Sequence, residues 1–205
     1  MVTVAPRTRL DFKRTDPYRA TSSPRMVDVA PTAFLTVDGE GAPATGGFQK
    51  AVETLYPVAY ALKFALKGAG RRDWVVAPLE ALWWSAKGEL RSTKAHPERL
   101  RWRAMLAQPA EVRAEDVERA VEAASRRHAL PSIGSIRFDA YDEGMSAQVL
   151  HVGPYSAEDE TIVRLLDYIA EQRRVPRLLH HEIYLSDPNR TAPERLRTII
   201  RQPVG

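Results

Sequence analysis

Three residues that could carry chemistry lie close together near the carboxyl end of the chain: His180, Glu182 and Tyr184. The segment 179–185 is typical of a β-strand, in which side chains alternate between the two faces, so these three share one face. A carboxylate on an apolar face is costly unless a donor or a cation pairs with it. Glu182 is therefore predicted to bind a cationic ligand or to act as a general base toward water, with the tyrosine and histidine as its donors.

A second glutamate stands in a similar segment, 79–84, whose sequence is Leu-Glu-Ala-Leu-Trp-Trp. Alternation divides this segment into two sets of side chains. We predict that one set packs against a helix, namely Leu79, Ala81 and Trp83. We predict that the other set faces the same cleft as Glu182, namely Glu80, Leu82 and Trp84. A planar cation stacked on this Trp84 would gain roughly 0.5–2 kcal/mol.

The alternative for both glutamates is that they have no role in a ligand site, and instead face solvent or pair with some of the many arginines. Two further aromatic residues are weaker candidates: Tyr155, at a turn, would border the pocket or simply pack, and Trp102 would be a pocket wall or a core residue. The run 180–182, His-His-Glu, resembles a metal site, but neighbouring strand residues point to opposite faces. Because HExxH spacing and cysteine are also absent, we predict neither a metal nor a cofactor.

The elements that must position these residues occur twice along the chain. A strand, a helix and two more strands are predicted over residues 27–108, and the same order returns over 146–203. One such module covers a single face of its sheet, so two modules related by a pseudo-twofold axis would bury more surface and form a cleft between them. We therefore predict an α+β fold of two βαββ repeats (about 27–128 and 134–204), with antiparallel sheets, helices on one side and a central cleft. Both repeats would belong to one domain, 26–205, after an extended N-terminal arm, 1–25.

Composition excludes several classes of protein. The chain of 205 residues has 44% hydrophobic and 27% charged residues and no cysteine, which indicates a folded protein without disulfides. Its net charge of +4 is scattered along the sequence, so we expect no direct binding of nucleic acid. No signal peptide or membrane-spanning stretch is visible, which favours a cytoplasmic protein.

Several segments, in order, resemble the stand-alone GyrI-like proteins. They are 55–57 (Leu-Tyr-Pro), 78–84, 148–155 and, most specifically, 180–188 (HHEIYLSDP). The resemblance implies a duplicated SHS2-type fold, which also serves as the effector-binding domain of multidrug-responsive transcription activators. In those activators an acidic residue at the position of Glu182 recognises lipophilic cations.

The resemblance to some stand-alone members of that family implies a further activity. This activity is the hydrolysis of cyclopropane-bearing, DNA-alkylating natural products, which protects the cell. In such a reaction Glu182 would activate water, Tyr184 would donate a hydrogen bond or position the acid, and Trp84 would stack on the flat ligand. Two other functions stay open: a non-catalytic protein that sequesters or senses planar aromatic or cationic molecules, and a gyrase-modulating interaction protein. Whether two copies of the chain form a homodimer also stays open.

Overall fold

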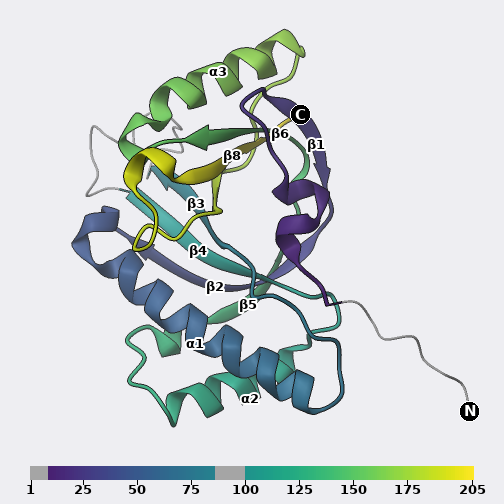
Figure 1. The fold of residues 1–205 in the computed structure, drawn as a ribbon, viewed down its shortest axis with the longest axis vertical. Helices are drawn as coiled ribbons and strands as arrows, with labels where there is room; N and C mark the ends of the chain where they lie inside the picture. The colour runs from purple at the N-terminus through teal and green to yellow at the C-terminus, as the bar shows by residue number, and fades with distance from the viewer. Residues whose placement is uncertain (1–8, 86–99) are drawn as a thin grey trace, which may run out of the picture.

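Eight strands form one antiparallel sheet in the computed structural model, which describes residues 9–85 and 100–205 (Figure 1). Their order across the sheet is β1-β6-β8-β7-β3-β4-β2-β5. The strands are β1 (Arg25–Val29), β2 (Thr32–Glu40), β3 (Leu79–Ser85), β4 (Leu100–Gln108), β5 (Arg137–Tyr141), β6 (Gly144–Val152), β7 (His180–Tyr184) and β8 (Arg197–Pro203). The helices are α1 (Gly47–Gly68), α2 (Ala114–Ser125) and α3 (Glu158–Glu171).

The predicted repeat is present in this order. The first unit is β2-α1-β3-β4 and the second is β6-α3-β7-β8, and each lies in the sheet with its third element innermost. The two units meet where β3 pairs with β7, and β5 and β1 add one strand at each outer edge. The turn residues at 142–144 predict a hairpin between 135–141 and 146–152, but this prediction is wrong, because β5 pairs with β2 while β6 pairs with β1 and β8.

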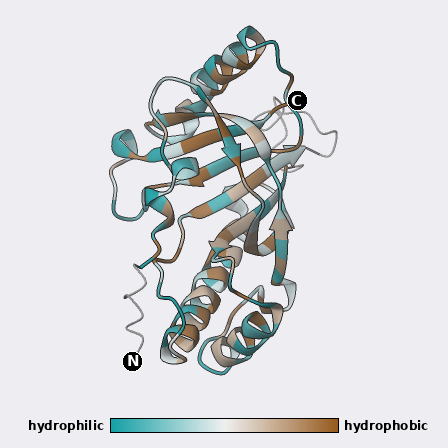
Figure 2. Cartoon of the chain, turned by 90° about the vertical axis from the view of Figure 1, so that its right-hand side faces the viewer, coloured by the Kyte–Doolittle hydropathy of each residue, from teal (hydrophilic) through white to brown (hydrophobic). Residues whose placement is uncertain are grey.

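The helices cover one face of the sheet. The apolar stripe of α1 packs against β2 and β4, α3 packs against β6, and α2 packs against α1. Figure 2 shows apolar residues concentrated along the strands, where the sheet meets these helices. Pro57 lies within α1, which nevertheless runs on for 22 residues instead of splitting as Pro57 suggests. No helix in the described part of the chain has the length and apolar character that a membrane crossing requires.

The N-terminal arm covers the other face of the sheet. The structure places two short 3₁₀ helices there, Phe12–Arg14 and Asp16–Tyr18, and buries both aromatic side chains. In Figure 1 these purple turns lie across the sheet from α1. The arm is therefore packed and turned where an extended segment was expected, and residues 1–8 of it lie outside the described residues.

Candidate functional site

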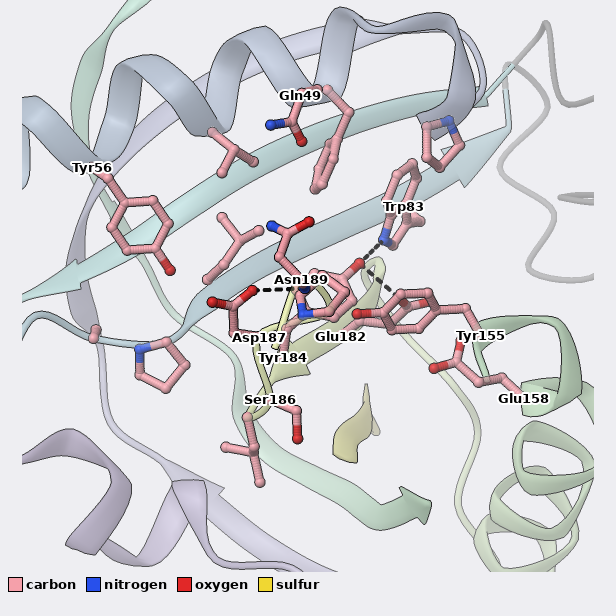
Figure 3. Close-up of a pocket in the computed structure, with 18 of the residues that line it drawn as sticks. Gln49, Tyr56, Trp83, Tyr155, Glu158, Glu182, Tyr184, Ser186, Asp187 and Asn189 are labelled. Carbon is pink, nitrogen blue, oxygen red and sulfur yellow. Dashed lines mark hydrogen bonds between the residues drawn. The ribbon is translucent and has the colours of Figure 1, made fainter. Parts of the chain in front are cut away.

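A cavity of about 860 Å³, here called the site cavity, lies between α1 and α3 on the helix-covered face (Figure 3). Its floor is formed by β3 and β7, the two strands at which the repeats meet. The loop 185–189, which follows β7, and the segment 75–78, which precedes β3, complete the wall. The cavity therefore depends on both repeats.

Glu182 is held in this floor by two hydrogen bonds. The Tyr184 hydroxyl donates to Glu182 Oε2 at 2.7 Å, and His180 Nε2 lies 3.2 Å from Glu182 Oε1. The Trp83 indole N–H in turn donates to the Tyr184 hydroxyl at 3.0 Å. Glu182 keeps 14% of its side chain exposed, so each oxygen is fixed by one donor while the carboxylate stays accessible from the cavity.

Aromatic rings surround this carboxylate. Phe48 from α1 packs on Trp83 with ring centroids 5.1 Å apart, and Tyr155 meets Tyr184 edge to face at 5.7 Å. These rings give a flat ligand surfaces on which to stack beside Glu182.

Burial raises the pKa of Tyr184 well above its ordinary value, and the neighbouring Glu182 carboxylate raises it further. Burial also raises the pKa of Tyr155 to about 12, with added effects of Glu158 and Glu182. Both phenols therefore stay protonated at neutral pH, and Tyr184 serves as a hydrogen-bond donor to Glu182.

The site cavity is acidic although the chain as a whole is basic. Its lining contains five carboxylates and one lysine, namely Asp11, Glu158, Asp159, Glu182, Asp187 and Lys13. The ammonium group of this lysine donates to the Leu185 carbonyl at 2.8 Å, which ties the N-terminal arm to the loop after β7. The excess of carboxylates gives the cavity a field that attracts cations.

The predicted site residues divide into two groups. Four of them line the cavity: Glu182, Tyr184, His180 and Tyr155. Four of them do not: Glu80, Leu82, Trp84 and Trp102.

Leu79 and Trp83 of β3 lie on the helix-covered face, as predicted, but the cavity lies on this face too. The predicted place of Glu80, Leu82 and Trp84 in the cleft is therefore wrong, and the strand register shows why. Ala81 pairs with Glu182 and Trp83 pairs with His180, so the odd-numbered residues of β3 share the cavity face. Glu80 stands opposite Ile183, on the face that the N-terminal arm covers. A displacement of one residue moves every side chain to the other face.

Trp102 shares the cavity face but lies behind Phe48, whose ring meets it edge to face at 5.2 Å. It is 3% exposed and rests on Gly39 of β2, where a Cβ atom would lie 2.2 Å from the indole ring. Only glycine fits there, so Trp102 is a core residue that supports the cavity wall from behind.

Glu80 belongs to a buried ionic network beneath the cavity floor, which consists of Glu80, Glu143, His181 and Arg201. The His181 ring lies 3.0 Å from Glu80 and 2.9 Å from Glu143, and Arg201 donates to Glu143 at 2.8 Å. Tyr18 of the arm closes the network by donating to Glu80 at 2.5 Å. Two carboxylates and two cations thus balance one another away from solvent.

This network makes stability depend on pH. Burial alone would lower the pKa of His181, but the two carboxylates outweigh it and raise this pKa from 6.5 to about 9. Burial alone would raise the pKa of Glu143, but His181 and Arg201 outweigh it and lower this pKa from 4.5 to about 2. The stabilisation from His181 is complete below pH 6.5 and is lost as the pH rises through 9. The stabilisation from Glu143 is complete above pH 4.5 and is lost as the pH falls through 2. We therefore expect the free energy of unfolding, measured with urea, to be largest near pH 4.5–6.5 and to fall toward pH 9.

The exposed His128 provides the control for this prediction. His128→Gln should keep the alkaline decline of the unfolding free energy, whereas His181→Gln should flatten it. A wild-type protein that becomes more stable between pH 6.5 and 9 would contradict the assignment.

Sequence reasoning missed several residues of the cavity wall. They are Phe48, Tyr56, Trp83, Glu158 and Asp187. The strongest available signal was Trp83, which was predicted to face a helix and does so, while the cleft was expected on the opposite face. No group of three or more His, Asp or Glu side chains suited to a metal ion occurs among residues 9–85 and 100–205.

Residues 22–204 match the family described as GyrI-like small molecule binding domain. An uncharacterized conserved protein from Listeria innocua is 34% identical, with 96% of this chain and 100% of that chain covered and a TM-score of 0.87. A second structure, described as a hydrolase from Listeria innocua, is 32% identical over the same shares of both chains, with a TM-score of 0.84. None of the curated proteins compared matches this chain.

The fold extends to more distant proteins. The C-terminal domain of EcmrR has a TM-score of 0.57 at 11% identity, with 89% of this chain and 97% of that domain covered. At this identity the similarity concerns the fold alone.

Proposed function

Because this chain belongs to the family of GyrI-like small-molecule-binding domains, we propose that its site cavity binds planar lipophilic compounds and hydrolyses those with a strained, electrophilic ring. The observation that carries this proposal is the Glu182 carboxylate, held by Tyr184 and His180 and open to an aromatic cavity.

Binding is supported by the size and the walls of the cavity. A volume of about 860 Å³ lies in the range of pockets that enclose drug-sized molecules. Trp83, Phe48 and Tyr155 provide ring faces and edges, and Trp83 takes the stacking role that the sequence suggested for Trp84. A planar ligand would lie with its reactive carbon toward Glu182.

Catalysis requires a base beside a bound water molecule, and Glu182 suits this role. In a cyclopropane conjugated to a dienone, the water oxygen bonds to the ring CH₂ while Glu182 accepts a proton from that water. The C–C bond of the cyclopropane breaks, and its electron pair aromatises the dienone and leaves a phenolate. The phenolate then takes a proton, so the net reaction adds one water molecule. Tyr184, whose proton is committed to Glu182, acts by positioning the carboxylate.

The similarity to a hydrolase of 32% identity over nearly the whole chain supports a hydrolytic activity of this site. Opening the strained ring would remove an electrophile that alkylates DNA, which is how such an enzyme would protect its cell.

The test is incubation of the purified protein with a cyclopropyl-dienone compound while its ultraviolet spectrum is followed. We expect the dienone absorption to disappear in molar excess over protein, with a hydrated phenol as the product. A spectral change that stops at one equivalent, without this product, would contradict hydrolysis.

The acidity of the cavity favours a second candidate, non-catalytic binding of planar cations. Five carboxylates and one lysine line the cavity, so a cationic ring would gain electrostatic attraction as well as stacking. In this case a planar cation should bind more tightly than a neutral compound of the same shape, and the affinity should fall with ionic strength.

A further inference from the structure

The proposed hydrolysis needs a second group, which Glu182, Tyr184 and His180 do not supply. When water attacks the cyclopropane, negative charge develops on the dienone oxygen at the opposite end of the conjugated ring. A hydrogen-bond donor placed at that oxygen lowers the barrier because it stabilises charge that appears only in the transition state. The donor must therefore lie across the cavity from Glu182.

The donors beside Glu182 are already committed. The Tyr184 hydroxyl donates to Glu182, and the Trp83 indole N–H donates to that same hydroxyl. Tyr155 lies on the Glu182 side, against Tyr184. None of these groups can bond to an oxygen at the far end of a ligand whose reactive carbon lies at Glu182.

Tyr56 occupies the far end. Helix α1 runs along the cavity from Phe48, which packs on Trp83, to Tyr56, and eight helical residues span about 12 Å. Tyr56 reaches the cavity near Leu79, at the start of β3, and from Leu79 to Trp83 the strand also covers about 13 Å. Figure 3 shows Tyr56 on one side of the cavity, with its hydroxyl turned inward, and Trp83, Glu182 and Tyr155 on the other.

The phenol of Tyr56 is equipped to donate. Among the hydrogen bonds of residues 9–85 and 100–205, no acceptor takes its proton, whereas the backbone N–H of Leu79 is directed at its oxygen. Burial raises its pKa to about 12, with smaller effects of Tyr60 and Asp187. The group therefore keeps its proton across the physiological range and can offer it to a ligand.

From this geometry we infer that Tyr56 is a catalytic residue, which donates a hydrogen bond to the carbonyl oxygen of a planar dienone while Glu182 directs water at the opposite end. This inference rests on the proposed function and narrows its substrate class to compounds whose electrophilic carbon and carbonyl stand at opposite ends of one conjugated ring.

The two residues divide the reaction between them. Glu182 accepts the proton of the attacking water, the cyclopropane C–C bond breaks, and the electron pair reaches the carbonyl oxygen. The Tyr56 hydroxyl bonds to the resulting phenolate without giving up its proton. Solvent then protonates the phenolate and takes the proton from Glu182, which restores the site.

The test compares Tyr56→Phe with the wild-type protein in hydrolysis of a cyclopropyl-dienone compound. We expect kcat to fall on the order of 10²-fold, the usual loss of an oxyanion donor, while KM changes little. Tyr168→Phe, which removes a phenol from the half-buried surface of α3 outside the cavity, should hydrolyse the compound like the wild type.

A second substrate distinguishes a donor from a merely structural residue. For a dienone whose product is a more acidic phenol, less charge needs stabilising, so the deficit of Tyr56→Phe should shrink. A deficit of the same size for both substrates, or no deficit at all, would overturn the role of Tyr56 while leaving hydrolysis by Glu182 intact. A wild-type protein without turnover would overturn both.

Discussion

Replacing Glu182 by glutamine is expected to slow hydrolysis of a cyclopropyl-dienone compound by about 10²–10⁴-fold, the usual contribution of a general base. Glutamine has nearly the same shape and can still accept the hydrogen bond from Tyr184, but its amide cannot take a proton from water. Binding of a neutral planar ligand, measured by quenching of tryptophan fluorescence, should change little. The rate should be measured under single-turnover conditions, so that product release does not mask the chemical step.

Glu160→Gln is the matched control, because it removes an exposed carboxylate of α3 outside the cavity. It should hydrolyse the compound at the wild-type rate. Undiminished hydrolysis by Glu182→Gln would remove Glu182 from the mechanism. If turnover is absent throughout and Glu182→Gln instead loses affinity for planar cations, the site is a binding site alone.

Replacing Arg201 by methionine is expected to lower the free energy of unfolding by about 3–5 kcal/mol, the cost of breaking a buried ion pair. Arg201 is 2% exposed and bonds to Glu143 and Gln148, and its guanidinium also donates to the Pro17 carbonyl of the arm. Without it, His181 alone would balance the carboxylates of Glu80 and Glu143. Urea unfolding at pH 6 measures the change.

The exposed Arg197 of the same strand gives the control, and Arg197→Met should cost little. Adding Glu143→Gln to Arg201→Met should restore part of the loss, because it removes the unpaired charge. A double variant less stable than Arg201→Met would show that packing of the arginine, rather than its charge, provides the stability.

The strand that carries Glu182 could be predicted from sequence. In β7 the polar residues His180, Glu182 and Tyr184 alternate with others, so their common face follows from the period of a strand. The assumption that the cleft lies on the face away from the helices was wrong, since the cavity opens between α1 and α3.

The side of β3 on which the cavity lies could not be predicted in the same way. This strand lies at the centre of the sheet, and apolar residues such as Leu82 and Trp83 follow one another, so that both faces of the strand are apolar. A strand buried on both faces has no polar period that marks either one. Glu80 and Glu182 therefore occupy similar places in the sequence but not in the structure. Because Ala81 pairs with Glu182, the two glutamates lie on opposite faces of the sheet.

The ionic network lay beyond sequence reasoning for another reason. Its members come from β3, β7, β8 and the turn at Glu143, and Tyr18 comes from an arm that has no periodicity. Only the three-dimensional register brings such residues together. Tyr56 was predicted only in part: the segment 55–57 contributes to the family resemblance, but the sequence does not show that the side chain of Tyr56 reaches the cavity.

The pairing of β3 with β7, where the two repeats meet, also suggests how such a site could arise. The five pairs between β3 and β7 are centred on Ala81 opposite Glu182, close to the approximate twofold axis. Two identical units meeting there would place the same residue on both sides, and a glutamate would face its own copy at about 5 Å, where like charges repel. Fusion of the units into one polypeptide removes this constraint, because each copy can then mutate separately. One copy can supply the acid and the other the small residue that leaves room for it, an arrangement that two identical units related by exact symmetry cannot have.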